Sequence, residues 1–378
     1  MPGDLHTHTT FSDGSTPADK LPFLAACAGM THLAISDHDS IRSVRYAYAH
    51  PVQNGVHLIP ATELTAYDYE RAHRVHLLCY WPDDCAALAD FSAMMAERRL
   101  TAMLQSCKEL EAICPQFRTE EALELAKDSG TLFKAQVMRV LWQYGLADGM
   151  YNAVYKSLFG LKPVRGRILH TPRYEPVDTV LDVIKASRAV VVLAHPSVYH
   201  SMELARELIA AGRLDGVEID HPRNTPEDRA ELTRLAKENG LIVTGGTDYH
   251  GINTVTPRPV GAFTTGDEMI ARIGDIAKAR KSTYKDKNKE QIKMTYTYNN
   301  KGTCSVRTVV ELNDDHTIKS VQILGRLRRQ PEGHRQAAAR HEGRGRHRPH
   351  GGHDLWPQAH QLPDQIAQAL KGALAEMG

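Results

Sequence analysis

Short apolar runs alternate with longer amphipathic segments along roughly the first 266 residues of the chain. The short runs are typical of buried strands, and the longer segments repeat apolar residues with the period of a helix. We predict strands over Leu33–Ser36, Val56–Pro60, Arg74–Cys79, Ala189–Ala194, Gly216–Ile219 and Leu241–Thr244. We predict helices over Pro17–Ala28, Pro176–Ser187, Ser201–Ala211 and Pro226–Asn239. This alternation indicates an α/β fold with a mostly parallel sheet, and six or more units favour a barrel.

The alternation is interrupted once and later ends. Between about residues 86 and 155 the pattern is only helical, which predicts an insertion over the barrel mouth. The charged run KSTYKDKNKEQIK has the composition of a linker. Residues 294–324 then alternate apolar and polar positions, as hairpins do, with a turn at Asn313–Asp315. We therefore predict three parts, namely a main domain over 1–280, a linker over 281–293 and a small C-terminal segment over 294–378.

Composition narrows the class of protein. The chain has 378 residues, 42% of them hydrophobic and 24% charged, as in ordinary globular proteins. A formal net charge of +1 gives no overall field that would attract nucleic acid or membrane. The six cysteines form no CxxC pair, and neither a signal peptide nor a run of about 18 apolar residues is visible. These features predict a soluble cytoplasmic protein with reduced thiols and no membrane partner.

The candidate chemistry lies where the predicted strands end. The chain has 20 histidines, and several of them stand with carboxylates at these ends. His6 and His8 are two residues apart, so in a strand they share one face and can chelate one ion. The other clusters contain Asp37–Asp39, Glu63, His76, His195 and Asp248–His250. Barrel enzymes assemble their sites at these strand ends, so we expect a metal site there. Asp37 and Asp39 either orient ligand histidines or cap loops.

The run DLHTHTTFSDGS, followed in order by SDHD, TEL, AHP and GTDYHG, resembles the PHP (polymerase and histidinol phosphatase) superfamily over about residues 4–265. The resemblance implies a distorted (β/α)7 barrel that holds two or three divalent ions. Mixed nitrogen and oxygen ligands suit Mn, Zn or Fe. The family resemblance also implies how the ligands divide among the ions. One ion would be bound by His6, His8, Glu63 and Asp248, a second by Glu63, His76 and His250, and a third by Asp13, His38 and His195. Among these ligands, the resemblance assigns catalytic roles to Glu63, Asp248 and His195.

Such a cluster suits hydrolysis of a phosphomonoester by a metal-bridged hydroxide, because closely spaced cations activate water and neutralise the phosphoryl group. The helical insertion and the HxVH pattern at His73–His76 resemble a subgroup that acts on nucleotides or short RNA. That subgroup commonly has an Arg-x-His pair where this chain has Lys134 and Gln136. We expect a small phosphorylated substrate, a nucleotide or very short oligonucleotide, and no obligate protein partner. Its predicted contacts are Lys134, Arg139, His221 and Arg223.

Several alternatives stay open. The same metals would serve a phosphodiesterase or exoribonuclease, or a phosphatase of another small phosphomonoester such as a sugar or histidinol phosphate. A catalytically silent regulatory module is the non-enzymatic alternative, although all nine ligand positions hold competent residues. A metal-dependent C–N hydrolase on a related barrel would require an HxH strand and a lysine that bridges its metal ions. Phosphoester chemistry explains the SDHD and GTDYHG motifs better.

The C-terminal segment has two interpretations. Residues 295–324 resemble the start of a small TSCPD domain, and residues 362–375 resemble its end. Between them, residues 325–361 are rich in Arg, His and Pro without apolar periodicity, which predicts disorder. We hypothesise that this stretch is read in a shifted frame, so that its histidines form no metal site. The rival interpretation is a basic tail that binds nucleic acid.

Overall fold

The computed structural model describes residues 2–161, 163–290, 294–300, 307–312, 318–324 and 366–372. The chain divides into two compact units, residues 1–281 and residues 282–378. No helix in these described ranges is both long enough and apolar enough to cross a membrane.

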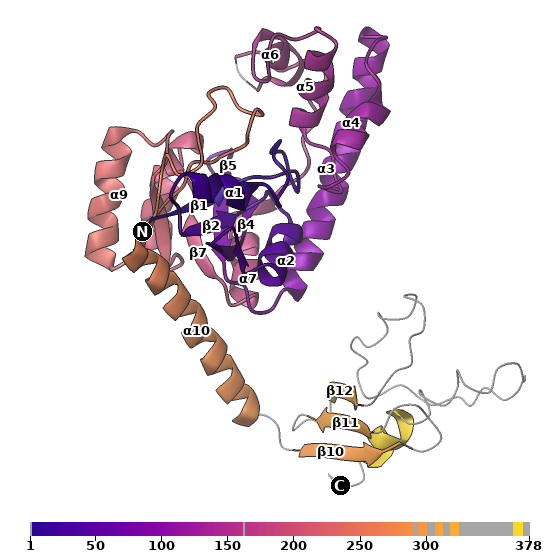
Figure 1. Cartoon of the computed structure of the whole chain (residues 1–378), viewed down its shortest axis with the longest axis vertical. Helices are drawn as coiled ribbons and strands as arrows, with labels where there is room; N and C mark the ends of the chain where they lie inside the picture. Colours follow the sequence, from indigo (N-terminus) through magenta and orange to yellow (C-terminus); the bar gives the residue numbers. More distant parts are fainter. Residues whose placement is uncertain are drawn as a thin grey trace, which may run out of the picture. The chain divides into compact units, whose positions relative to one another are not determined.

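The first unit is built on a curved sheet of nine strands (Figure 1). Its main path, in spatial order, is β1 (Gly3–Thr7), β2 (His32–Ile35), β4 (Val56–Asp68), β5 (His73–Tyr80), β7 (Val190–Leu193), β8 (Gly216–Asp220) and β9 (Ile242–Gly245). Two short strands, β3 (Val52–Gln53) and β6 (Glu175–Pro176), pair with β4 beside this path. Neighbours on the path are parallel except around β5, which is antiparallel to both β4 and β7.

The two ends of the sheet meet. The backbone N–H of Asp248, just after β9, donates to the carbonyl of His6 at 2.8 Å, and the N–H of His8 donates to the carbonyl of Tyr249 at 2.8 Å. These bonds bring β1 against the segment that follows β9. The sheet therefore closes into a nearly complete barrel, and the predicted barrel class is confirmed.

One hairpin departs from the predicted pattern. The apolar run over Val56–Pro60 predicted a short strand, but β4 continues to Asp68 and turns directly into the antiparallel β5. Glu63 consequently lies inside a strand and not beyond its end, paired with Leu78 of β5. A buried ionisable residue in the middle of β4 broke the apolar run and hid the strand's true length.

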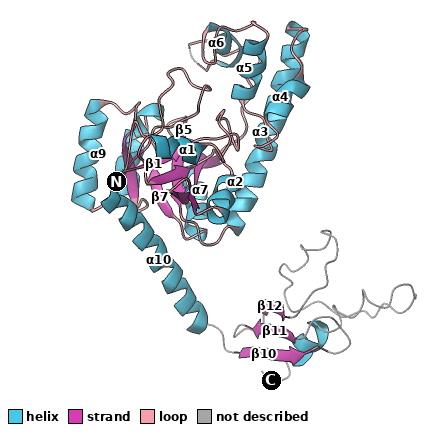
Figure 2. Ribbon diagram, viewed as in Figure 1, coloured by secondary structure: helices cyan, strands magenta, loops and turns pink. Residues whose placement is uncertain are grey.

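Helices surround the barrel on its outer side (Figure 2). The helices outside the insertion are α1 (Leu21–Cys27), α2 (Ile41–Ala49), α7 (Val177–Ala186), the 3-10 turn η1 (Pro196–Tyr199), α8 (Met202–Ala210), α9 (Pro226–Asn239) and α10 (Asp267–Glu290). Inside the barrel, Leu5, Ile59, Leu78 and other inward side chains form a core with Ile273 of α10. This filled interior supports the polar cluster at the barrel mouth.

The predicted helical insertion consists of α3 (Ala86–Ile113), α4 (Thr119–Leu125), α5 (Lys134–Gln143) and α6 (Ala153–Phe159). It has a hydrophobic core of its own, in which Phe117, Val137 and Phe159 are almost fully buried. Gln136 joins this insertion to the barrel, because its amide donates to the carbonyl of Ser12 at 2.9 Å. The insertion is thus held beside the loop that carries Asp13.

The segment with linker composition is helical over residues 281–290, which belong to α10, and its last three residues lie outside the described ranges. In the second unit, β10 (Met294–Asn299), β11 (Arg307–Leu312) and β12 (Ile318–Leu324) form an antiparallel sheet, as the alternating pattern predicted. Residues 366–372 are helical, and Ala369 packs with Val310 and Leu312. The predicted turn at 313–315 and the predicted disorder over 325–361 lie outside the described residues.

Candidate metal centre

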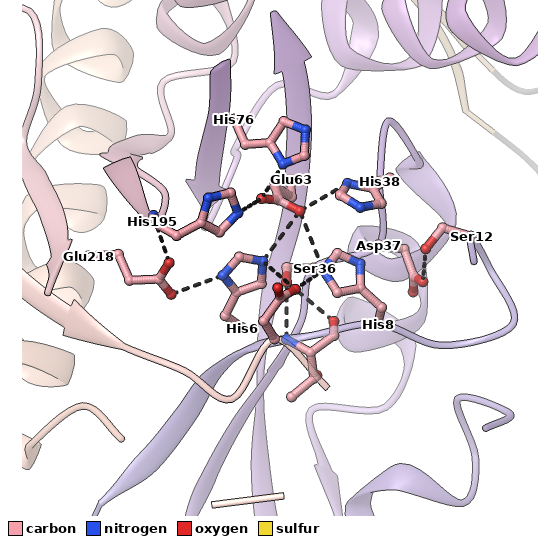
Figure 3. A network of polar contacts seen from close by, with 12 residues as sticks. His6, His8, Ser12, Ser36, Asp37, His38, Glu63, His76, His195 and Glu218 are labelled. Atoms are coloured by element: carbon pink, nitrogen blue, oxygen red, sulfur yellow. Dashed lines mark hydrogen bonds and ion pairs between the residues drawn. The ribbon is translucent and has the colours of Figure 1, made fainter. Parts of the chain in front are cut away.

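Glu63 lies at the centre of the polar cluster (Figure 3). Its Oε1 atom is 2.9 Å from both His76 Nδ1 and His195 Nε2. Its Oε2 atom is 2.9 Å from His38 Nδ1 and 3.3 Å from the Nε2 atoms of His6 and His8. One fully buried carboxylate therefore faces five histidines that come from different strands and loops.

Asp248 completes the first group. Its Oδ1 atom lies 3.3 Å from His8 Nε2 and 3.6 Å from His6 Nε2. Asp248 has a φ of 53°, in the left-handed region that non-glycine residues seldom occupy. Strained backbone of this kind persists where surrounding contacts fix it, often at functional sites. His6, His8, Glu63 and Asp248 thus lie together, in the grouping that the family resemblance implied.

A further group lies toward the insertion. His250 Nε2 is 3.3 Å from Asp13 Oδ1, and His38 Nε2 is 4.0 Å from the same oxygen. The rings of His8 and His250 stack with their centroids 4.1 Å apart. Asp13, His38 and His250 are therefore close enough together to hold one ion.

The distances between side chains differ from the expected division of ligands. His250 was expected with Glu63 and His76, but it lies with Asp13. His195 was expected with Asp13 and His38, but its Nε2 faces the same Glu63 oxygen as His76. The two histidines exchange groups, although both belong to the cluster. Sequence order gave no guide here, because the closed barrel determines which strand ends face each other.

The cluster has the unsatisfied atoms that metal ligands require. In the described part of the chain, His6 Nε2, both ring nitrogens of His8, His38 Nδ1 and Glu63 Oε2 are buried without a hydrogen-bond partner. Leaving a buried polar atom unpaired costs about 1–3 kcal/mol. A divalent cation accepts lone pairs from imidazole and carboxylate and offsets this cost. The residues present therefore fit divalent ions.

The protonation states of Glu63, Asp248 and His76 agree with this fit. Burial alone would raise the pKa of Glu63, but the facing histidines, His76 foremost, hold that pKa well below its usual range. Burial lowers the pKa of His76 to about 3, so its imidazole is neutral. Asp248, despite its burial, has its pKa held well below the usual range by His250 and other histidines. Ionised carboxylates and neutral imidazoles are the forms that bind metals. Burial lowers the pKa values of His6 and His8, but the facing carboxylates outweigh it and raise both, so a bound cation would displace protons from these two rings.

A second layer of buried groups supports the cluster. Glu218, in β8, is fully buried and accepts from His6 Nδ1 and from the backbone N–H of His195, each at 2.9 Å. The sequence analysis missed Glu218. Its signal was a lone glutamate inside the apolar run Gly216–Ile219, where a strand with both faces covered has no other reason for a carboxylate.

Asp37 and Asp39 prove to be loop-capping residues. Asp37 accepts from the backbone N–H and hydroxyl of Thr9 at 2.8 and 2.7 Å and from the Ser12 hydroxyl at 2.6 Å. Asp39 accepts from the N–H of Thr65 at 2.7 Å and pairs with Arg99. Of the two interpretations of these carboxylates, the loop-capping one agrees with their contacts.

A cavity of about 610 Å³ opens above the cluster, between the barrel and the insertion. Asp13, His38, His76, His195, Asp248 and His250 contribute to its floor. Outside these residues its charged lining is basic, namely Arg74, Arg99, Lys134, Arg223 and Arg258, and no acidic residue joins them.

Two of the four predicted substrate contacts, Lys134 and Arg223, line this cavity. The other two, His221 and Arg139, are not among the lining residues. His221 is fully buried, with Nε2 3.3 Å from Asp248 Oδ2. The Arg139 guanidinium donates at 3.5 Å to Asn253, which does line the cavity.

Comparisons with known proteins agree with the fold. The family model of the PHP domain matches residues 4–105. The phosphoribosyl 1,2-cyclic phosphate 1,2-diphosphodiesterase of Eggerthella lenta is 33% identical over 249 residues, which cover 66% of this chain and 94% of that protein. The 5′-3′ exoribonuclease Rnm of Salmonella typhimurium is 30% identical over 255 residues, which cover 65% of this chain and 84% of that protein. A solved structure from Bifidobacterium adolescentis, described as a putative metal-dependent phosphoesterase, superposes with a TM-score of 0.65 at 26% sequence identity. The superposed region covers 72% of this chain and 96% of that one.

The barrel and its histidine–carboxylate cluster define a metal-dependent phosphoesterase. The chain belongs to the PHP family, as its motifs predicted.

Proposed function

We propose that this phosphoesterase hydrolyses a small ribose phosphate of the nucleotide type, with its scissile phosphate at the metal cluster and a second phosphate at the basic wall. The observation that carries the proposal is the cavity, whose floor holds the proposed ligands and whose remaining charged lining is entirely basic. A volume of about 610 Å³ is within the range of small-molecule sites. The two relatives act, by their names, on a phosphoribosyl cyclic phosphate and on RNA.

Two or three divalent ions, of Mn, Zn or Fe, are the proposed cofactors, and when bound they would activate water and neutralise charge on the scissile phosphate. His6, His8, Glu63 and Asp248 would hold the first ion. Glu63, His76 and His195 would hold the second, and Asp13, His38 and His250 would hold the third. Glu63 is shared by two groups, so it would hold one ion on each side of its carboxylate. Asp248 and His195 reach the cavity floor and so face the reacting phosphate.

Aromatic rings hold the basic wall in place. The Arg74 guanidinium lies 4.8 Å from the centroid of the Tyr199 ring, and that of Arg99 lies 4.4 Å from the centroid of Phe133. Stacking orients these planar donors at little entropic cost, and the Arg99 guanidinium is held in addition by its pair with Asp39. Lys134 lies near the same guanidinium groups. Like charges gathered this closely are stabilised when an anion joins them.

The expected scissile group is the terminal phosphate of a mononucleotide or very short oligonucleotide. The test is hydrolysis of a matched panel by the Mn-loaded protein: a nucleoside 3′,5′-bisphosphate, the corresponding 3′- and 5′-monophosphates, and a sugar monophosphate. The bisphosphate should have the highest kcat/KM, because only it offers a phosphate to both the ions and the wall. Equal kcat/KM for the bisphosphate and both monophosphates would contradict the role of the wall.

A second candidate, cleavage of an internal phosphodiester in a short RNA, is favoured by a second cavity. This cavity, of about 690 Å³, shares His38 and Arg99 with the first and is also lined by Arg42 and Arg45. A chain that enters the first cavity could continue into the second, where arginines would meet its next phosphate. Arg42→Ala with Arg45→Ala should then lower kcat/KM for a trinucleotide and leave that for a mononucleotide unchanged. An equal effect on both substrates would argue against this path.

A further inference from the structure

Glu218 lies outside the proposed ligand groups and outside the cavity lining, yet it contacts two of the ligands. Its Oε1 lies 2.9 Å from His6 Nδ1, and its Oε2 accepts from the backbone N–H of His195 at 2.9 Å (Figure 3). It is fully buried in β8, between the strands that precede and follow it in the barrel. Because each oxygen has its own N–H partner, both are engaged.

The first contact determines the tautomer of His6. A neutral imidazole carries one N–H, and a carboxylate facing Nδ1 places the proton there. The lone pair is then on Nε2, which is the atom that lies 3.3 Å from Glu63 Oε2 and 3.6 Å from Asp248 Oδ1. Glu218 thus presents His6 to the ion position in its ligating form.

The second contact fixes the backbone of His195. This residue has φ 26° and ψ 64°, which is unfavourable for any side chain with a Cβ. The bond to Glu218 holds its N–H in that conformation, from which Nε2 reaches Glu63 at 2.9 Å. One carboxylate therefore positions two ligand histidines that belong to different ion groups.

The alternative is that Glu218 is itself a ligand, since its oxygen lies near nitrogens of His6, His195 and His221. An ion held between Glu218 Oε1 and His6 Nδ1 would have to displace the Nδ1 proton, and both nitrogens of His6 would then be metal-bound. We propose that Glu218 is a positioning residue that sets the tautomer of His6 and the backbone of His195. The inference rests on the proposed ligand roles of these two histidines and does not depend on the substrate.

The test compares ion affinities of the full-length protein and its Glu218→Gln variant by competition with a chelator. A glutamine has nearly the same shape but offers one acceptor and one donor, so it cannot accept from both N–H groups. Loss of such a supporting carboxylate typically lowers metal affinity about 10- to 100-fold. We expect that loss, with unchanged ion stoichiometry at saturating Zn. Asp215→Asn is the matched control, because Asp215 precedes the same strand and accepts from Val191 N–H and from Arg280 without touching a ligand, so it reports the loss of a structural carboxylate alone.

A second measurement needs no variant at position 218. NMR spectra of the Zn-loaded protein with 15N-labelled histidine should show His6 as the Nδ1–H tautomer. The His6 signal is assigned as the one that disappears in the His6→Asn variant. An Nε2–H tautomer, or wild-type ion affinity in Glu218→Gln, would overturn the proposal. So would the loss of one whole ion at saturation, which would make Glu218 a ligand. If His6→Asn leaves ion binding unchanged, the ligand assignment itself fails, and this outcome is separate from the other three.

Discussion

The Nε2 atom of His195 lies 2.9 Å from Oε1 of Glu63, across 132 residues of sequence. His76 Nδ1 approaches the same oxygen at the same distance. Because they share this oxygen, we group His195 with His76 as proposed ligands of one ion, and we group His250 with Asp13 as proposed ligands of another. The division of the ligands between the ions can therefore be tested by asking which histidines act as a pair.

Removal of His76 and His195 should be non-additive. Each single change to alanine takes one ligand from the same proposed ion, so the second change costs little once that ion is lost. His76→Ala with His250→Ala should instead be additive, because these residues belong to different groups. Ion stoichiometry and affinity, measured by elemental analysis and chelator competition, provide the comparison. Non-additivity for the pair with His250 would restore the division expected from the sequence.

Glu63→Ala should lower both ion content and activity, because Glu63 is common to two groups. The contacts of its two oxygens with five histidines join both groups to this one carboxylate. Asp68→Asn is a suitable control on the same strand, since Asp68 pairs with Arg71 at the far end of β4 and contacts no proposed ligand. Full activity and ion content in Glu63→Ala would contradict the proposed centre.

Lys134→Arg should improve the use of a bisphosphorylated substrate. Arginine adds a second donor in a planar fork, and such a charge-assisted contact contributes about 1.5–3 kcal/mol, roughly ten- to hundred-fold in kcat/KM. The change in kcat/KM should be measured for the bisphosphate and for the matching monophosphate. Only the bisphosphate can place one phosphate at the ions and the other at the basic wall. An equal gain for both would place Lys134 at the scissile phosphate.

The benefit of Lys134→Arg should also grow with pH. Burial, and then the positive charges nearby, Arg74 foremost, lower the pKa of Lys134 to about 7. In the free enzyme the amine is therefore charged below about pH 7 and loses its charge above it, whereas arginine stays charged. The ratio of kcat/KM between variant and parent should rise between about pH 6 and pH 9, and titrations common to both proteins cancel in that ratio. A flat ratio would show that Lys134 keeps its charge.

Truncation after Lys281 should leave kcat/KM within about twofold of the full chain, because the first compact unit contains every proposed ligand and the whole cavity. Arg280 must be kept, since it donates to both oxygens of Asp215 at 2.6 and 2.9 Å. Truncation after Ala279 is the matched control and should lower the melting temperature. Loss of activity in the longer form, with its fold intact by circular dichroism, would assign the second unit a part in catalysis.

Local pattern was sufficient for much of this protein. The period of apolar residues located the helices, including α9 over Pro226–Asn239, because a helix buries one stripe of its own sequence. Runs such as Val190–Leu193 gave the strands, because strands covered on both faces are continuously apolar. Short motifs supplied the identity of the nine proposed ligands, since a ligand must have a particular chemistry wherever it lies.

Only the tertiary structure decided how these residues are combined. Closure of the barrel brings His195 to Glu63 and His250 to Asp13, and no local pattern records which strand ends face each other. The reversal of β5 was hidden because Glu63 breaks the apolar run of its own strand. Glu218 and the lowered pKa of Lys134 follow from burial beside groups distant in sequence. Residue chemistry is a local property of the chain, whereas distances, burial and charge arise from contacts between distant segments.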